Sequence, residues 1–239
     1  KNYPVTDKKN NNNSKHINSF DFISKLSSKM SGNETIVTDM GTSFTCTMQT
    51  FKIKKPLKQR LFTSSGLVAM GYGLPGVIGA YFGNNKKKPI CISGEGGLMF
   101  NIQELQTIKN YKIPFKLFIL ENKGYLTMKL MQKKNFNKFV GSDPVSGLSF
   151  PSFKKISETF GFKYHRLINN NIDIQLSKIL SSKFPTVIEI NMHPFQELIP
   201  RLQNRLNKDG SFLLSKFDDL YPHLPKKILD YERKRAREI

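Results

Sequence analysis

Residues 89–132 read PICISGEGGLMFNIQELQTIKNYKIPFKLFILENKGYLTMKLMQ. The apolar run 89–93 ends in glycines around Glu95, and a segment with helical spacing follows it. A second apolar run, residues 115–120, ends in the polar letters ENKGY. Two apolar runs joined by a helical segment predict a βαβ unit, in which the two strands are parallel.

Two oxygen-bearing side chains, Glu95 and Asn122, follow these two strands. Parallel strands joined by a crossover helix end at the same edge of the sheet, so we expect the two residues to meet there. Carboxylate and amide oxygens are hard ligands that suit Mg²⁺ or Ca²⁺. Glycines beside the carboxylate allow main-chain N–H groups to approach a phosphate closely. The pattern therefore predicts a metal-bridged diphosphate site.

This stretch resembles the thiamine diphosphate signature of the acetolactate synthase and 2-oxo-acid decarboxylase superfamily, which is Gly-Asp-Gly followed further along by Asn-Asn. The matching letters are Gly94-Glu95-Gly96 and Glu121-Asn122, with glutamate in place of the Asp and of the first Asn. Mg²⁺ demands near-ideal octahedral geometry, so the longer side chain of Glu95 requires the main chain to adjust. Glu121 is expected at the strand end, either solvated or capping.

A second match covers residues 61–80, LFTSSGLVAMGYGLPGVIGA, in which five glycines lie among apolar residues. Such a run predicts a tightly packed helix and loop. It is similar to the family stretch Gly-x-Met-Gly-x-Gly-Leu-Pro. The resemblance implies that Met70 presses between the two rings of the cofactor and that the main chain of Val68 contacts its aminopyrimidine. Without the rest of the stretch, Met70 would be interpreted as an ordinary core residue.

The resemblance implies metal ligation by Glu95, the side chain of Asn122 and the carbonyl of Gly124. It implies cofactor contacts from residues after three strands and in the glycine-rich stretch: Gly41, Thr42, Ser43, Val68, Met70, Gly94, Gly96, Gly97, Asn122, Gly124 and Tyr125. No catalytic residue is expected in this chain, because the family's glutamate that protonates the aminopyrimidine lies in a second domain.

By the same resemblance, the chain is the diphosphate half of a thiamine diphosphate- and Mg²⁺-dependent enzyme that decarboxylates or carboligates 2-oxo acids. It would need a pyrimidine-binding domain or subunit and would form a homo-oligomer, a dimer or a tetramer. The alternative is a catalytically degenerate relative with a structural or regulatory role, favoured by the two glutamates that depart from the signature.

Apolar segments alternate with helical ones along the chain and predict an α/β fold, a doubly wound parallel sheet of five to six strands with helices on both faces. The predicted strand centres are Ile36, Cys91, Phe118, Tyr164 and Ile188. We expect an Asn-rich disordered or linker arm at 1–17, the diphosphate and metal domain at 18–195, and an extension at 196–239. The extension is similar to that of acetolactate-synthase-like proteins found with bacterial surface-sugar genes. The first residue is Lys, which suggests a piece of a longer product.

The 239 residues carry a net charge of +20. The basic residues are scattered without an aromatic–basic repeat, so we interpret the charge as compositional drift and do not expect a nucleic-acid partner. Two cysteines favour a reducing compartment, the cytoplasm, and the absence of an 18-residue apolar run argues against a membrane span. The four histidines share no ligand spacing and are expected to be solvated or structural: His16, His165, His193 and His223.

Overall fold

The computed structural model describes residues 15–64, 66–85, 87–168, 172–203, 205–206, 209, 211–213 and 215–238. The chain divides into two compact units, one that ends at Gln196 and one that begins at Glu197. Residues 1–14 of the predicted N-terminal arm lie outside the described residues.

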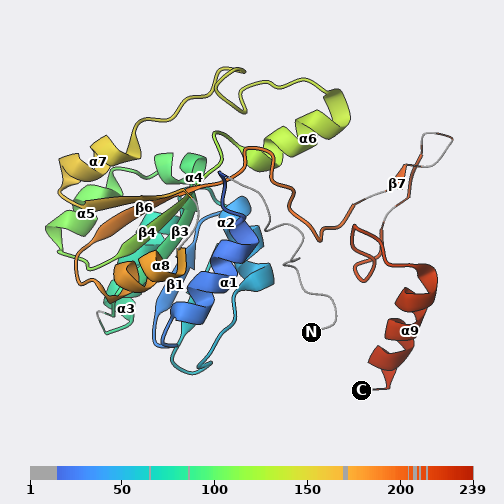
Figure 1. Cartoon of the computed structure of the whole chain (residues 1–239), viewed down its shortest axis with the longest axis horizontal. Helices are drawn as coiled ribbons and strands as arrows, with labels where there is room; N and C mark the ends of the chain where they lie inside the picture. Colours follow the sequence, from blue (N-terminus) through green and yellow to red (C-terminus); the bar gives the residue numbers. More distant parts are fainter. Residues whose placement is uncertain are drawn as a thin grey trace. The chain divides into compact units, whose positions relative to one another are not determined.

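The first unit is built on a sheet that, in the described part of the chain, has six strands, all parallel. The strands are β1 (Thr35–Thr38), β2 (Arg60–Phe62), β3 (Pro89–Gly94), β4 (Lys116–Glu121), β5 (Lys163–Leu167) and β6 (Thr186–Asn191). Their order is β2-β1-β3-β4-β6-β5, and Figure 1 labels β1, β3, β4 and β6 of this sheet. The predicted doubly wound α/β class is confirmed. The edge strand β2 was not predicted, because its three residues begin a segment that was interpreted as helix and loop.

Helices cover both faces of this sheet (Figure 1). The described helices of the unit are α1 (Ser19–Lys29), α2 (Thr42–Thr50), α3 (Gly73–Gly83), α4 (Glu95–Met99), α5 (Glu104–Asn110), α6 (Leu126–Phe136), α7 (Phe153–Phe160) and α8 (Ile172–Ser181). Helix α1 packs against α2 and α8, and α5 packs against α3 and α7. The glycines after the first apolar run, expected between strand and helical segment, already belong in part to the short helix α4, which begins at Glu95.

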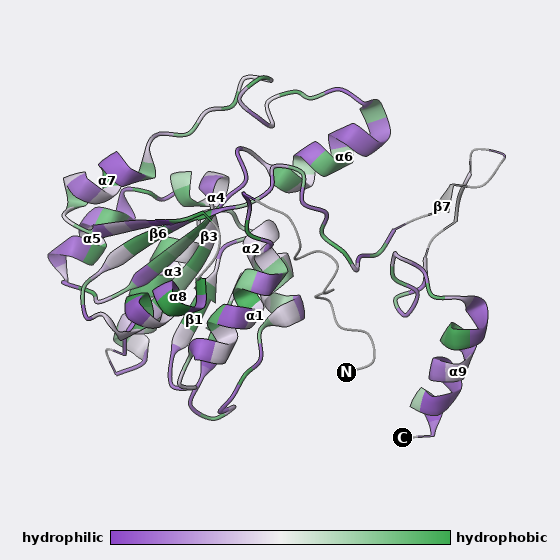
Figure 2. Cartoon of the chain, in the orientation of Figure 1, coloured by the Kyte–Doolittle hydropathy of each residue, from purple (hydrophilic) through white to green (hydrophobic). Residues whose placement is uncertain are grey.

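The central strands β3, β4 and β6 are buried almost throughout, as parallel strands covered on both faces must be. On one face Phe22 of α1 lies against Phe118, with ring centroids 5.4 Å apart. On the other face Leu117 and Ile119 join a core cluster with residues of α3, α5 and α7. Figure 2 shows apolar central strands, and helices such as α1 that carry both hydrophobic and hydrophilic residues.

The strand order reverses between β1 and β3, because the chain runs from β1 to β2 on one side and from β3 to β4 on the other. Ligands of open parallel sheets bind beyond the carboxyl ends of the strands at such a switch point. The ends of β1 and β3, at residues 39–41 and 94–95, therefore lie where a ligand site is expected.

The second unit contains an antiparallel pair, β7 (Arg205–Leu206) and β8 (Phe212–Leu213), and the helix α9 (Lys226–Arg237). Asp209 lies between the two strands along the chain. No described helix is long and apolar enough to cross a bilayer.

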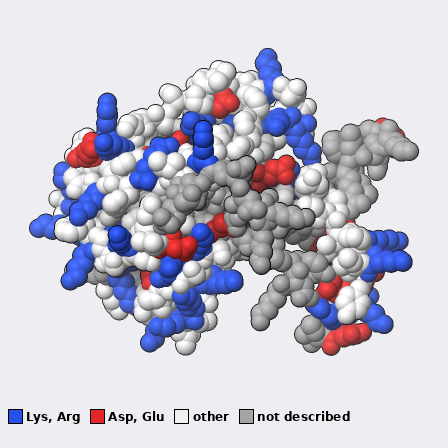
Figure 3. All heavy atoms as spheres, viewed as in Figure 1, with Lys and Arg blue, Asp and Glu red and all other residues white. Residues whose placement is uncertain are grey.

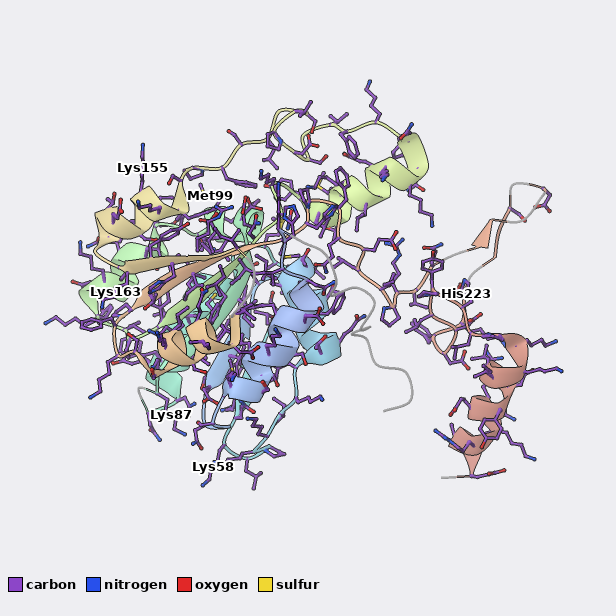
Figure 4. All side chains as sticks on the ribbon, viewed as in Figure 1. Lys58, Lys87, Met99, Lys155, Lys163 and His223 are labelled. Atoms are coloured by element: carbon purple, nitrogen blue, oxygen red, sulfur yellow. The ribbon has the colours of Figure 1, made fainter. Side chains whose placement is uncertain are left out.

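The basic side chains are spread over the visible surface and do not gather in one patch, and acidic residues lie among them (Figure 3). Lys58, Lys87 and Lys155 are exposed and point away from the body of the molecule (Figure 4). This distribution fits the interpretation of the charge as drift in composition.

Candidate functional site

The loops that follow β3 and β4 meet at one edge of the sheet. The main-chain N–H of Asn122 donates to Oε2 of Glu95 at 2.8 Å, and the N–H of Gly124 donates to the same oxygen at 3.5 Å. The strands that carry these loops are direct neighbours, with Gly94 opposite Leu120. The predicted meeting of Glu95 and Asn122 is therefore seen in the structure.

The carboxylate of Glu95 is enclosed by protein, with 4 % of the residue exposed. Burial raises the pKa of Glu95 to about 7, and the nearby negative charge of Glu121 acts in the same direction. The hydrogen bonds from Asn122 and Gly124 act against these effects. A buried carboxylate of this kind gains from a cation that compensates its charge.

Asn122 supplies a second oxygen at the same place. Its residue is 3 % exposed, and its Oδ1 has no hydrogen-bond partner among the described residues. Buried side-chain oxygens nearly always have a partner, so this one points to a ligand. The structure describes no cluster of three His, Cys, Asp or Glu side chains, so a cation here would be held by one carboxylate with amide and main-chain oxygens.

Gly124 has a main-chain conformation that only glycine adopts easily, with φ +147°. A Cβ on Gly124 would lie 2.1 Å from the carbonyl oxygen of Ser142. That carbonyl also accepts the N–H of Tyr125 at 2.9 Å. The 139–148 loop is thereby fastened onto the loop that carries Asn122.

Lys129 of α6 is also part of the site and was not predicted from the sequence. It is 1 % exposed, and its Nζ donates to the carbonyls of Asn122 at 2.8 Å and Lys123 at 3.4 Å. Burial lowers the pKa of Lys129, while the charges of Asp143 and Glu95 oppose that shift. The ammonium thus binds carbonyls of the same loop whose N–H groups bind Glu95.

Asp39, at the end of β1, joins three segments of the site and was likewise missed. Its Oδ1 accepts the N–H of Met40 at 2.8 Å and of Gly71 at 3.0 Å. Its Oδ2 accepts the N–H of Gly73 and the hydroxyl of Ser93, both at 3.2 Å. An acidic residue directly after a strand and before a glycine could have been chosen from the sequence, as Glu95 was.

The first predicted diphosphate segment, Gly41-Thr42-Ser43, forms the N-terminus of α2. Gly41 has φ +72°, and nothing lies within 4 Å of the place where its Cβ would be, so this main chain is open to a ligand. Ser43 is buried and its hydroxyl donates to the carbonyl of Met40 at 2.9 Å. The segment therefore offers main-chain N–H groups at a helix N-terminus, which favour anions.

Val68 and Met70 lie in the loop before α3, and both side chains are exposed, by 59 % and 39 %. Val68 has φ +54°, a conformation that is rare for β-branched residues and that clusters at ligand sites. Two hydrogen bonds hold this loop. The N–H of Val68 donates to the carbonyl of Ser64 at 2.9 Å, and the N–H of Gly71 donates to Oδ1 of Asp39 at 3.0 Å.

The glycines around Glu95 differ in what they face. Nothing lies within 4 Å of a Cβ placed on Gly94, so its main chain is open. A Cβ on Gly96 would lie 2.0 Å from the ring of Tyr125, and one on Gly97 would lie 2.8 Å from the carboxylate of Asp39. The last two glycines make room for protein groups.

Glu121 is neither solvated nor capping, and that prediction was wrong. The residue is 7 % exposed, and its Oε2 lies 2.5 Å from Nη2 of Arg166 on β5. Burial raises the pKa of Glu121, and Arg166 opposes the rise. The sequence could not pair residues 45 positions apart on strands that are not neighbours. His16 and His193, both expected to be solvated or structural, lie against each other, with ring centroids 5.3 Å apart.

Comparison with known proteins agrees with this geometry. Residues 39–190 match the thiamine pyrophosphate enzyme, C-terminal TPP binding domain. The chain is 30 % identical over 206 residues to a probable acetolactate synthase large subunit of Methanococcus aeolicus, which covers 86 % of this chain and 33 % of that protein. It is 28 % identical over 186 residues to acetolactate synthase isozyme 1 large subunit of Escherichia coli (strain K12), covering 77 % and 32 %.

A third relative is the acetolactate synthase large subunit of Porphyra purpurea, 33 % identical over 149 residues, which cover 62 % of this chain and 24 % of that protein. The chain thus spans a third or less of the length of these relatives. The matched region contains the ends of β1, β3 and β4, with Asp39, Glu95 and Asn122. The chain therefore belongs to the thiamine pyrophosphate enzymes, as an acetolactate-synthase-like protein that carries their C-terminal TPP-binding domain.

Proposed function

We propose that this domain binds thiamine diphosphate through Mg²⁺, which is held by the carboxylate of Glu95, Oδ1 of Asn122 and the carbonyl of Gly124. The observation that carries the proposal is the buried Oδ1 of Asn122, which has no partner among the described residues and belongs to the loop bonded to Glu95. Three hard oxygen donors of this kind suit Mg²⁺, which completes its shell with water and phosphate oxygens.

The diphosphate would lie against open main chain at the ends of β1 and β3. Gly41 and Gly94 leave that space free, and the N-terminus of α2 faces it with N–H groups. The thiazolium and aminopyrimidine would lie along Val68 and Met70, whose side chains are exposed. Thiamine diphosphate, when bound, supplies the electron sink that decarboxylation of a 2-oxo acid requires.

The enzyme that this domain serves would act on 2-oxo acids by decarboxylation or carboligation. Relatives called acetolactate synthase large subunits are about three times as long as the matched part of this chain, which supports a further pyrimidine-binding domain or subunit. Leu67 is 89 % exposed beside Val68 and Met70, an apolar surface that a partner would cover. A second copy of the chain in a homo-oligomer is part of the same proposal.

A relative that keeps the fold without the cofactor is the second candidate. It is favoured by Oε2 of Glu95, which already accepts main-chain N–H groups, and by the ammonium of Lys129, whose positive charge lies near Glu95. In such a protein, Glu95 would have only a structural role, as a hydrogen-bond acceptor that joins two loops, and no cation would be needed.

Titration calorimetry with thiamine diphosphate separates the two candidates. We expect uptake in the presence of Mg²⁺, little or no uptake in EDTA, and loss of the Mg²⁺-dependent part in Asn122→Ala. The matched control is Asn110→Ala, which removes an exposed asparagine at the end of α5. Uptake that is equal with and without Mg²⁺, or equal in the two variants, would contradict the proposed metal site.

A further inference from the structure

Arg166 connects three strands at the same edge of the sheet as the candidate site. It lies on the edge strand β5, opposite Glu189 of β6, and its guanidinium reaches past β6 to β4. Nη1 lies 2.6 Å from Oε1 of Glu189, and Nη2 lies 2.5 Å from Oε2 of Glu121. Nη2 also donates to Oδ1 of Asn191 at 3.4 Å.

Both carboxylates that Arg166 contacts are withdrawn from water, with side-chain exposures of 10 % for Glu121 and 8 % for Glu189. Burying a carboxylate costs free energy unless the group is paired and hydrogen-bonded. These contacts therefore hold the side chains of Arg166, Glu121 and Glu189 in one geometry. The planar guanidinium serves two carboxylates at once, which a lysine could not do with the same geometry.

Glu121 is the last residue of β4 and directly precedes Asn122. Its side chain is held by Arg166, and its carbonyl accepts the N–H of Met192 at 2.8 Å. Glu121 is thus fixed through both side chain and main chain before the chain turns toward Glu95. The direction in which Asn122 presents Oδ1 depends on where this strand end is held.

We propose that Arg166 and Glu121 are positioning residues, an ion pair between β5 and β4 that holds the Asn122–Gly124 loop in the geometry that a cation requires. This inference rests on the proposed function, because it names what orients the proposed ligands. Substituting a group that orients a metal ligand typically lowers metal affinity by about 10- to 100-fold.

Charge alone predicts a different result from positioning. By charge alone, removing the positive charge of Arg166 should strengthen the binding of a cation, and removing the negative charge of Glu121 should weaken it. If the ion pair instead positions the loop, both losses should weaken binding. The two explanations thus differ in the sign of the effect that the Arg166 substitution has on cation binding.

The experiment uses Arg166→Gln, Glu121→Gln and the double variant, with Mg²⁺ and inorganic pyrophosphate or thiamine diphosphate as probes. We expect each single variant to weaken Mg²⁺-dependent binding by about tenfold, and the double variant to be no weaker than either single one. The matched control is Tyr164→Phe, which removes a 2.7 Å hydrogen bond to Glu189 from the same strand and leaves Glu121 paired. The control should bind as the parent chain does.

Tighter binding in Arg166→Gln with weaker binding in Glu121→Gln would overturn the inference in favour of charge alone. Unchanged binding in both would overturn it in favour of a purely structural pair. A second readout does not depend on the cofactor: amide hydrogen exchange at Asn122 and Gly124 in the chain alone. We expect faster amide exchange at these two residues in both single variants, but not in Tyr164→Phe. This result is expected even if the parent chain takes up no probe. Unchanged exchange in the single variants would contradict the positioning role.

Discussion

Glu95 connects the two halves of the candidate site through one oxygen atom. Its Oε2 accepts the N–H of Asn122 at 2.8 Å and, more weakly, the N–H of Gly124 at 3.5 Å, so it joins the segment after β3 to the loop after β4. Its carboxylate reaches the neighbouring loop while the residue remains buried. Glu95 therefore has a structural role at this position.

Replacing Glu95 by glutamine tests whether the charge serves a cation. We expect Glu95→Gln to weaken Mg²⁺-dependent thiamine diphosphate binding by about tenfold or more. The free energy of unfolding should stay equal or rise, because a buried neutral amide costs less than a buried carboxylate. Calorimetry and urea denaturation measure the two quantities, with Glu104→Gln of α5 as the control. If Glu95→Gln bound thiamine diphosphate with Mg²⁺ as tightly as the parent chain does, the carboxylate would have only a structural role.

Single residues differ in how well the sequence predicts them. Glu95 and Asn122 could be found because each directly follows an apolar strand, and parallel topology brings such positions together. Lys129 and Arg166 could not, because their roles depend on which carbonyl or carboxylate lies opposite them. Lysine on a helix and arginine on an edge strand are ordinary surface choices by residue type alone.

At the scale of elements, the loop between α6 and α7 is bound to α6 by Gln132 and to the Asn122 loop by the carbonyl of Ser142, which accepts the N–H of Tyr125. Oε1 of Gln132 accepts the hydroxyl of Ser142 at 2.7 Å, and its Nε2 donates to the carbonyl of Val140 at 3.0 Å. The carbonyl of Ser142 lies where a Cβ of Gly124 would be. The two loops can approach this closely only because residue 124 is glycine.

A pair of glycine substitutions tests this contact. Gly124→Ala should displace the 139–148 loop and abolish Mg²⁺-dependent binding, because its Cβ would lie 2.1 Å from a main-chain oxygen. Gly141→Ala is the matched control, since it also has positive φ, +57°, but open space around a Cβ. The control should lose only about 1 kcal/mol of stability from its strained conformation and keep binding. Equal binding in the two variants, checked by calorimetry, would contradict the close approach.

The hydrophobic pattern of the sequence predicts the strands and helices better than it predicts the local turns. The five predicted strand centres all lie in strands of the sheet. The central strands β3, β4 and β6 are recognisable because they are almost fully buried and largely apolar, whereas Tyr164 lies on the polar edge strand β5. Strand β2 is an edge strand of three partly exposed residues and has no such signal. Helix α4 starts inside a glycine-rich run that reads as a turn, and tertiary contacts with Tyr125 and Asp39 explain why glycine is needed there.

At the scale of the whole molecule, the sheet carries its candidate site at one edge and a cluster of lysines at the other. Lys116 is fully buried at the start of β4, and its Nζ donates to the carbonyl of Phe184 at 2.5 Å and to Oγ1 of Thr186 at 2.9 Å. Burial, with the charges of Lys88 and Lys163, lowers the pKa of Lys116 to about 8. The folded chain therefore disfavours the ammonium form.

This lowered pKa gives the stability of the chain a defined pH dependence. The unfolded chain protonates Lys116 near its ordinary pKa, so the contribution of the neutral lysine is present above that value and is lost as pH falls to 8. Lys116→Met should therefore be more stable than the parent at pH 7, by about 1 kcal/mol after the two lost hydrogen bonds, and the difference should shrink toward pH 10.5. Denaturation at several pH values measures this, with exposed Lys87→Met as control. A difference independent of pH would contradict the lowered pKa.

The central claim is that the loops after β3 and β4 hold one divalent cation with a diphosphate, and paramagnetic broadening by Mn²⁺ tests it most directly. With thiamine diphosphate present, Mn²⁺ should broaden the amide resonances of residues 94–97 and 122–124 first and leave those around Lys116, at the opposite edge, sharp. Broadening that is centred elsewhere, or that is unaffected by the diphosphate, would contradict the claim.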